Sequence, residues 1–212
     1  MDAVLLSSPS SPYARKIRVA LHELGATQAV RVRDVNAHDP QSGLRDVNAA
    51  GRIPTLLVDG RMLHDSPVIL EWVDATFGPR LLPPSGDARW DALVRQATGD
   101  GLTDTLVPWR MEQMRPESER SPAFQAGCRA RANRILDALE HDAARGGLDG
   151  VHGAFDVGAI GIACALGYLD FRFGDLGWRA TRPALEAWYR AIAARPSLHA
   201  TRPHNLGEPP PA

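Results

Sequence analysis

Three short segments in the first third of the chain carry side chains that could bind and ionise a small thiol. They are Ser10-Ser11-Pro12-Tyr13, Arg52-Ile53-Pro54 and Asp65-Ser66. They supply a hydroxyl before a helix, an X-Pro step before a strand, and an acidic-hydroxyl pair before a second helix. Together they could hold one peptide-like ligand in extended form. A thiol needs such help, because with a pKa near 8.5 only about 3% of it is the nucleophilic thiolate at pH 7.

Ser11 is the first candidate for stabilising that thiolate. Because Pro12 suits the first helical position, Ser11 falls at the N-cap, beside the positive end of the helix dipole. One charge-assisted hydrogen bond from its hydroxyl is worth about 1.5–3 kcal/mol, which lowers a thiol pKa by roughly one to two units. A plain helix cap is the alternative role for Ser11. Ser10 is the second candidate, because a shift of one residue in the loop would present its hydroxyl instead.

The elements that position these side chains form an α/β unit of the order βαβαββα over residues 1–78. Alternating and apolar runs predict strands, and helical spacing predicts a first helix that ends at Gly25 and a last helix that ends before Gly78. The strands are expected at 3–7, 29–35, 55–58 and 61–64, with a short helix or turn at 40–48. Asp59-Gly60 predicts a tight antiparallel hairpin. The first two strands should be parallel, and Ser66 should cap the last helix with Pro67 as its first residue.

The rest of the chain shows only helical periodicity. We expect a linker at 79–86, an all-helical bundle over 87–206 and a disordered tail at 207–212. The segment 157–169 is apolar almost all round, which predicts the central helix of the bundle.

One feature of the bundle can be predicted at the level of single residues. Gly99, Gly101 and Pro108 are expected to bend or interrupt the first helix of the bundle.

The composition excludes several classes of function. The chain has 24 Lys and Arg against 25 Asp and Glu, a formal charge of -1, and so lacks the basic excess that nucleic-acid binding needs. No uninterrupted apolar run approaches the length of a membrane span, and no signal peptide is evident, so we expect no membrane association and a cytoplasmic location. Cys128 and Cys164 have no metal-ligand spacing, which predicts neither a metal site nor a disulfide.

The order of these units and their motifs resembles the glutathione S-transferase family. Four stretches carry the resemblance: Ser11 to Arg15, Arg52-Ile53-Pro54, Asp65-Ser66 and Ala165 to Arg172. The last is similar to bacterial members of the serine-type, theta- and zeta-like subgroup. The resemblance implies a thioredoxin-like first unit, glutathione as co-substrate and a small electrophile. It also implies a homodimer, in which the α/β unit of one subunit faces the helical unit of the other.

The resemblance further implies how glutathione would be held. Ile53-Pro54 would be a cis peptide, and the Ile53 backbone would pair with the cysteinyl backbone of glutathione as an added strand would. Arg52 would bind the glycyl carboxylate in a bidentate fork. Ser66 and the backbone at its helix start would bind the γ-glutamyl carboxylate, and Asp65 its ammonium group. His38 is a further candidate contact. A trans proline, a plain helix cap and a solvated histidine are the structural alternatives.

The electrophile is expected between the two units. Trp109 could stack on an apolar or aromatic acceptor, and Arg110 could stabilise developing negative charge. Tyr13, Leu106 and Gln113 complete the predicted contacts. Ordinary packing between the two units for Trp109 and a solvated Arg110 are the competing interpretation.

The leading functional hypothesis is a glutathione transferase in which a serine-stabilised thiolate attacks a small, hydrophobic or aromatic electrophile. Conjugation, dehalogenation and isomerisation all start from that thiolate. A disulfide reductase would need a cysteine near position 11, and the α/β unit has none. The non-enzymatic alternative is a transferase-like binding protein that retains the fold, with or without glutathione binding, and has no turnover.

Overall fold

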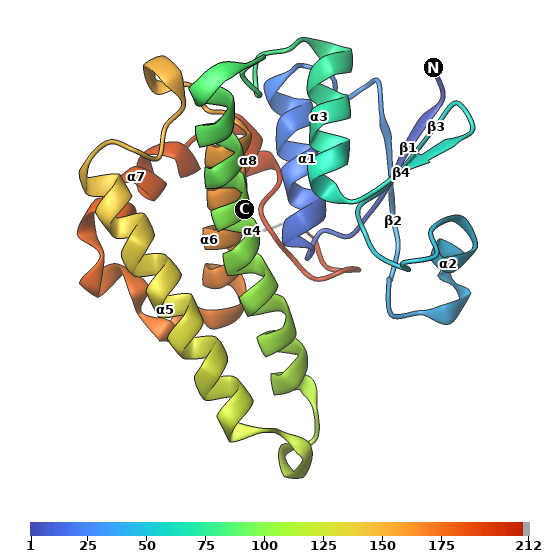
Figure 1. The fold of residues 1–212 in the computed structure, drawn as a ribbon. Helices are drawn as coiled ribbons and strands as arrows, with labels where there is room; N and C mark the ends of the chain where they lie inside the picture. Colours follow the sequence, from blue (N-terminus) through green and yellow to red (C-terminus); the bar gives the residue numbers. More distant parts are fainter. Residues whose placement is uncertain (210–212) are drawn as a thin grey trace. The chain divides into compact units, whose positions relative to one another are not determined.

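The computed structural model describes residues 1–209, and these fall into two compact units. The first contains Met1–Arg89 together with the chain from Arg195 onward, and the second is Trp90–Ala194. Figure 1 shows a sheet with its helices in the first unit and helices alone in the second. Positions 210–212 of the predicted disordered tail lie outside the described residues.

The first unit has the predicted βαβαββα order. Its elements are β1 (Ala3–Ser7), α1 (Pro12–Glu23), β2 (Arg31–Asp34), the 3-10 turn η1 (Pro40–Ser42), α2 (Leu44–Val47), β3 (Thr55–Val58), β4 (Arg61–Leu63) and α3 (Ser66–Phe77). The strands lie in the order β2-β1-β3-β4, with β1 parallel to β2 and antiparallel to β3, and β3 antiparallel to β4. The predicted pairing of the strands is therefore confirmed.

Two local signals account for much of this arrangement. Asp59 and Gly60 both have positive φ, 45° and 80°, and join β3 to β4 in the tight turn that the sequence predicts. The apolar stripe of α1, which includes Ile17 and Leu21, is buried. The helix packs against α3, and Figure 1 shows the two helices side by side. The start of α1 is thereby held at the carboxyl end of β1.

Asp74 fixes the chain where it leaves α3. Its side chain is buried, and its carboxylate accepts hydrogen bonds from the backbone N–H groups of Arg80, Leu81 and Leu82 at 2.9, 2.7 and 3.3 Å. Sequence reasoning did not predict this role, because the three donors belong to a loop that has no regular structure. The contacts hold the predicted linker segment against the end of α3.

Replacing Asp74 with alanine is expected to lower the free energy of unfolding by about 3 kcal/mol, because three N–H groups lose a charged acceptor. Urea denaturation of the variant measures the loss. The exposed Asp91, replaced by alanine, is the matched control and should change stability by less than about 0.5 kcal/mol. Equal stability of Asp74→Ala and the wild type would show that these bonds contribute nothing.

The second unit is helical throughout. Its helices are α4 (Gly86–Met114), whose first turn belongs to the first unit, α5 (Pro122–Ala144), α6 (Val157–Phe173) and α7 (Pro183–Ala193), joined through the 3-10 turns η2 (Glu117–Glu119), η3 (Val151–Gly153), η4 (Gly174–Leu176) and η5 (Trp178–Thr181). Every residue of α6 from 157 to 169 is buried, which confirms the predicted central helix. Asp156 caps it, and the Asp156 Oδ1 accepts a hydrogen bond from the Ala159 N–H at 3.0 Å.

The apolar character of α6 bears on the expectation of no membrane association. By length and composition alone, the described segment Val157–Leu176 would pass as a membrane span, with a mean hydropathy of 1.3. The expectation was based on uninterrupted apolar runs, and the run that starts at Val157 ends at Asp170. Since 78% of its most apolar window is buried, it has the character of a core helix in a soluble protein.

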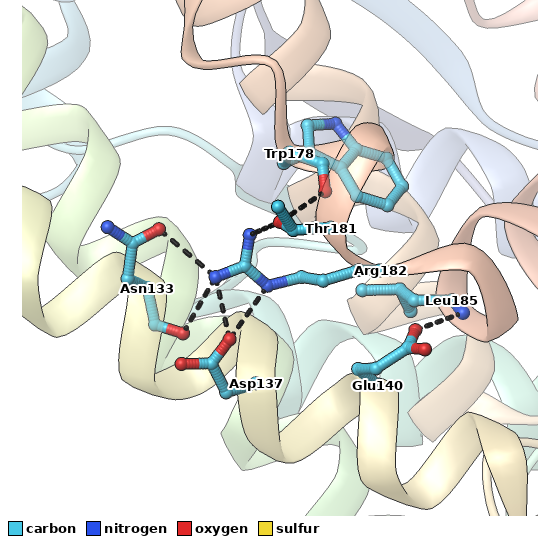
Figure 2. A network of polar contacts seen from close by, with 7 residues as sticks. All are labelled: Asn133, Asp137, Glu140, Trp178, Thr181, Arg182 and Leu185. Carbon is cyan, nitrogen blue, oxygen red and sulfur yellow. Dashed lines mark hydrogen bonds and ion pairs between the residues drawn. The ribbon is translucent and has the colours of Figure 1, made fainter.

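The start of α7 is held by α5 (Figure 2). The helix begins at Pro183, and the Glu140 carboxylate accepts a hydrogen bond from the Leu185 N–H at 2.7 Å. The Arg182 guanidinium, which is almost fully buried, donates to the Asp137 Oδ1 from Nη2 at 2.7 Å and from Nε at 3.0 Å. A glutamate from a neighbouring helix thus takes the place of an N-cap side chain, since the Arg182 side chain has no acceptor.

The predicted interruption of α4 is not found. The helix continues from Gly86 to Met114, past Gly99, Gly101 and Pro108. Gly99 instead permits close packing, because a Cβ at this position would lie 2.5 Å from the carbonyl carbon of Gly161 in α6. The glycine therefore serves contact between two helices rather than a break in one.

The last helix, α8 (Pro196–Ala200), belongs to the first unit, although the sequence analysis placed residues up to 206 in the helical bundle. It packs against α1. The Arg195 guanidinium donates to the Glu23 carboxylate at 2.6 and 3.0 Å, and the buried Arg15 donates from Nη2 to the carbonyl of Leu198 at 3.0 Å. Local sequence reveals nothing of these partners, and so it does not show which unit α8 joins.

Candidate functional site

Ser11 lies where the sequence predicts, at the N-cap of α1. Its backbone is extended, with φ -82° and ψ 119°, and Pro12 is the first helical residue. The Ser11 Oγ accepts a hydrogen bond from the Ala14 N–H at 3.2 Å. Because this bond uses a lone pair of the hydroxyl, the Ser11 proton is still available for donation. The side chain is half-buried, so a ligand can reach it at the positive end of the helix dipole.

Ser10, the second candidate, has a different partner. Its Oγ lies 3.1 Å from the Oγ of Ser8, and the two hydroxyls form one hydrogen bond. The backbone N–H of Ser11 donates to the carbonyl of Ser8 at 3.0 Å and closes the turn between them. Ser8 was not predicted as part of the site. Its hydroxyl shares a hydrogen bond with the Ser10 hydroxyl, in which either oxygen can be the donor.

The loop before Pro54 is organised by a buried asparagine that the sequence analysis missed. The Asn48 side chain is fully buried, and its Nδ2 donates to the Arg52 carbonyl at 3.2 Å and to the Thr55 Oγ1 at 2.8 Å. Thr55 Oγ1 in turn donates to the Arg52 carbonyl at 2.8 Å. Gly51, at a φ of 58°, allows the chain to turn between them. The only sequence signal for this role of Asn48 is its position directly after the short helix α2.

The Ile53-Pro54 peptide bond is cis, as the resemblance implies. The Ile53 side chain packs against an apolar cluster that contains Leu6, Val35 and Leu44. The pairing of β1 with β3 ends at Leu6 and Thr55, so the Ile53 backbone lies beyond the ladder. Arg52 is exposed to solvent.

The start of α3 differs from the prediction by one residue. Asp65 occupies the N-cap and Ser66 the first helical position, whereas Ser66 and Pro67 were expected there. The Asp65 side chain makes no capping hydrogen bond, and the first turn of α3 thus presents backbone N–H groups of the kind that bind anions. Ser66 is almost fully buried and Asp65 is exposed. The His64-Asp65 peptide bond is also cis.

The remaining predicted contacts of the first unit lie at or near its surface. His38 is exposed in the loop after β2, and its backbone N–H donates to the Asn36 Oδ1 at 3.0 Å. Tyr13 is half-buried in the first turn of α1, and the Lys16 Nζ lies 5.9 Å from the centre of its ring. Neither contact identifies a functional role for His38 or for Tyr13.

In the helical unit the four predicted electrophile contacts share α4 but differ in exposure. Leu106 and Trp109 are buried, and Arg110 and Gln113 are half-buried. The Trp109 ring lies 4.6 Å from the ring of Phe173 in α6. Trp109 therefore packs against a ring of its own unit.

Comparison with known proteins adds the family to this geometry. Residues 10–76 match the glutathione S-transferase N-terminal domain, and residues 118–191 match the glutathione S-transferase C-terminal domain. The chain is 31% identical over 202 residues to the uncharacterised GST-like protein YibF of Escherichia coli K12, covering 94% of this chain and 98% of that one.

Solved structures are similar over nearly the whole chain. A glutathione transferase family member from Pseudomonas fluorescens Pf-5, crystallised with glutathione, is 40% identical with a TM-score of 0.88, covering 96% of this chain and 100% of that one. A second structure from the same source, with a TM-score of 0.85, 39% identity and the same coverage, holds S-(propanoic acid)-glutathione. A glutathione S-transferase from Methylobacillus flagellatus KT with glutathione bound is 33% identical, has a TM-score of 0.86, and covers 96% of this chain and 100% of its own.

Proposed function

Because the chain belongs to the glutathione S-transferase family, we propose that it is a glutathione transferase in which the Ser11 hydroxyl stabilises the glutathione thiolate. Glutathione is its co-substrate. The observation that carries the proposal is the Ser11 side chain at the N-cap of α1, where its oxygen accepts from the Ala14 N–H and its proton can be donated to sulfur. The proposed serine-type mechanism therefore depends on the Ser11 hydroxyl.

The remaining motifs supply the contacts that hold the tripeptide. The Ile53 backbone, beyond the end of the β1–β3 ladder, pairs with the cysteinyl residue of glutathione. Ser66 and the N–H groups at the start of α3 bind the γ-glutamyl carboxylate, and the exposed Asp65 binds the ammonium group. Arg52 binds the glycyl carboxylate, with His38 as a further contact. The buried Asn48 supports this geometry by fixing the Arg52 carbonyl.

The second substrate is a small electrophile contacted by the helical unit and by Tyr13. Leu106 and Trp109 give the contact surface apolar character, and Arg110 and Gln113 add polar groups. The S-(propanoic acid)-glutathione bound by the Pf-5 protein supports a small substituent on the sulfur. Conjugation, dehalogenation and isomerisation remain alternative outcomes of the same thiolate chemistry, and detoxification in the cytoplasm is the role that conjugation would serve.

Calorimetric titration with glutathione, followed by a conjugation assay with a panel of small electrophiles, tests the proposal. We expect binding and turnover. Binding without turnover of any electrophile would favour the second candidate, a transferase-like binding protein, and absence of glutathione binding would contradict the proposed function.

We further propose a homodimer, with an exposed apolar face on α4 as part of its interface. Trp90 and Val94 are one helical turn apart and are 64% and 65% exposed. Light scattering is expected to give twice the subunit mass for the wild type and a single subunit mass for Trp90→Glu/Val94→Glu. Val151→Glu, at another exposed apolar residue, is the control and should stay dimeric. A monomeric wild type at micromolar concentration would contradict the proposal.

A further inference from the structure

The buried Arg15 of α1 carries a positive charge whose hydrogen-bond acceptors in the described chain are all neutral. Arg15 is 4% exposed. Its Nη2 donates to the Leu198 carbonyl at 3.0 Å, and its Nε donates to the Thr201 Oγ1 at 3.4 Å. Its Nη1 is buried and has no hydrogen-bond partner among residues 1–209. Because a buried charge is costly unless it is paired, we expect a negative group to bind nearby.

The acidic side chains of the helices around Arg15 have other partners. Glu23, at the end of α1, accepts from the Arg195 guanidinium at 2.6 and 3.0 Å. In α3, Asp74 accepts from three backbone N–H groups, and Glu71 pairs with Arg89 at 2.7 Å. The helix α8 has no acidic residue. These helices therefore supply no carboxylate for Arg15.

The other charged groups near this part of α1 do not balance Arg15 either. Lys16 and Arg18 are positive neighbours on the same helix, and His199 is the only other titratable group of α8. Burial lowers the pKa of Arg18, the negative charge of Asp34 in β2 opposes this effect, and the positive charge of Arg15 adds to it. Asp34 is thus placed to balance Arg18.

The last turn of α8 holds the Arg15 side chain. This helix packs against α1 within the first unit (Figure 1). Leu198 belongs to its last turn, where backbone carbonyls have no partner inside the helix, and Thr201 is its C-cap. The Thr201 Oγ1 donates its own proton to the Ser197 carbonyl at 2.8 Å, so it can only accept from Arg15. The guanidinium is therefore fixed at two points.

Arg15 also lies beside Ser11, the residue proposed to bind sulfur. The Arg15 backbone N–H donates to the Ser11 carbonyl at 3.0 Å and so makes the first hydrogen bond of α1. The two residues are four apart, so their side chains start about one helical turn, roughly 5–6 Å, from each other. A thiolate bound at Ser11 would place a negative charge at this end of the helix.

From these contacts we infer that Arg15, held by the last turn of α8, stabilises the bound thiolate through its charge while Ser11 donates the hydrogen bond. The inference rests on the proposed glutathione transferase function and adds the C-terminal segment to the glutathione site. When the thiol ionises, its proton passes to solvent and the sulfur supplies the negative charge that the described chain does not. Arg15 acts across space and needs no contact with sulfur.

A pH titration of bound glutathione, followed by the ultraviolet absorbance of the thiolate, tests the inference. Arg15→Met and Arg15→Gln both remove the charge, and glutamine can still donate to the Leu198 carbonyl. Each should raise the pKa of the bound thiol by roughly half a unit, less than the loss of the direct Ser11 hydrogen bond, because the charge acts at a distance. Arg15→Lys keeps the charge and should stay close to the wild type.

The pH dependence of kcat/KM separates the charge of Arg15 from a purely structural role. Because the charge favours the thiolate, its removal matters most below the thiol pKa and not at all well above it. Arg15→Met should lower kcat/KM about threefold near pH 6 and match the wild type above about pH 9. An equal loss at every pH would indicate a structural role and overturn the inference.

Glu23→Gln is the matched control, since it weakens the attachment of the same segment at the other end of α1. Glu23 accepts from Arg195 and Ser197 and lies about 18 Å along the helix from Ser11. This variant should lose stability and keep the thiol pKa of the wild type.

A wild-type thiol pKa in both neutral variants, or an equal rise in Arg15→Lys, would overturn the inference and leave the proposed function standing. Failure of the wild type to bind glutathione would instead refute the proposed function. Binding of S-methylglutathione, which has no thiol, reports whether each variant is folded. If Arg15→Met does not bind it, Arg15→Gln provides the comparison.

Discussion

Replacing Ser11 with alanine is expected to lower kcat/KM for conjugation by about 10- to 100-fold at pH 7, with the Kd for glutathione changed less than about threefold. The reason is that the Ser11 hydroxyl donates to a thiolate and contributes most when sulfur is charged, whereas binding of the tripeptide depends mainly on the loop before Pro54 and on the start of α3. Initial rates across a range of glutathione concentrations give kcat/KM, and calorimetry gives the Kd.

Two variants separate catalysis from the structural role of Ser11 as a helix cap. Ser11→Asp retains a good N-cap but offers no hydroxyl proton at pH 7, so it should be folded and as inactive as Ser11→Ala. Ser10→Ala removes the hydroxyl that bonds to Ser8 and should keep most of the activity. Full activity of Ser11→Asp, or a loss confined to Ser10→Ala, would contradict the assignment of Ser11.

Replacing Gly99 with alanine is expected to destabilise the protein by about 3 kcal/mol or more, because α4 and α6 are in backbone contact there. The new methyl group would lie 2.5 Å from the carbonyl carbon of Gly161 and 2.7 Å from the backbone nitrogen of Ile162, so the backbone of α6 would have to move. Backbone yields less readily than a side chain, which places this change at the upper end of overpacking costs. Urea denaturation measures the effect.

Gly101 provides the matched control in the same helix. A Cβ at Gly101 would meet no atom within 4 Å. Gly101→Ala should therefore stabilise the protein by up to about 1 kcal/mol, the ordinary difference between glycine and alanine inside a helix. If both alanine variants change stability in the same direction and by similar amounts, the close approach of α4 and α6 at Gly99 does not limit packing.

The parts of the fold that the sequence predicts are those with local causes. Pro12 and Ser11 specify the start of α1, because the ring of proline and the hydroxyl of serine act within one turn. Asp59-Gly60 specifies the hairpin through positive φ at two adjacent residues. The all-apolar run of α6 predicts its burial without any knowledge of its neighbours.

The parts that the sequence does not predict depend on partners distant in the chain or on single atoms. Nothing local to Asp74 reveals that its carboxylate will accept from three N–H groups of the following loop. Gly99 has the character of a helix breaker until Gly161 is known to lie against it. The helix α8 joins the first unit through contacts with Glu23 and Arg15, which lie near the other end of the chain.

The residues of the candidate site divide in the same way, into those with a local signal and those without one. The residues that would touch glutathione could be proposed from motifs, because each motif is a short sequence pattern. The role of Asn48, which supports the loop before Pro54, could not, since only the folded chain buries this side chain between the Arg52 carbonyl and Thr55.

The most direct test of serine-assisted ionisation is a pH titration of glutathione bound to the wild type and to Ser11→Ala, followed by the ultraviolet absorbance of the thiolate. For the wild type we predict a thiol pKa roughly one to two units below the ordinary value of about 8.5, and for Ser11→Ala a pKa that returns most of the way to it. The same pKa in both proteins would mean that Ser11 does not stabilise the sulfur anion.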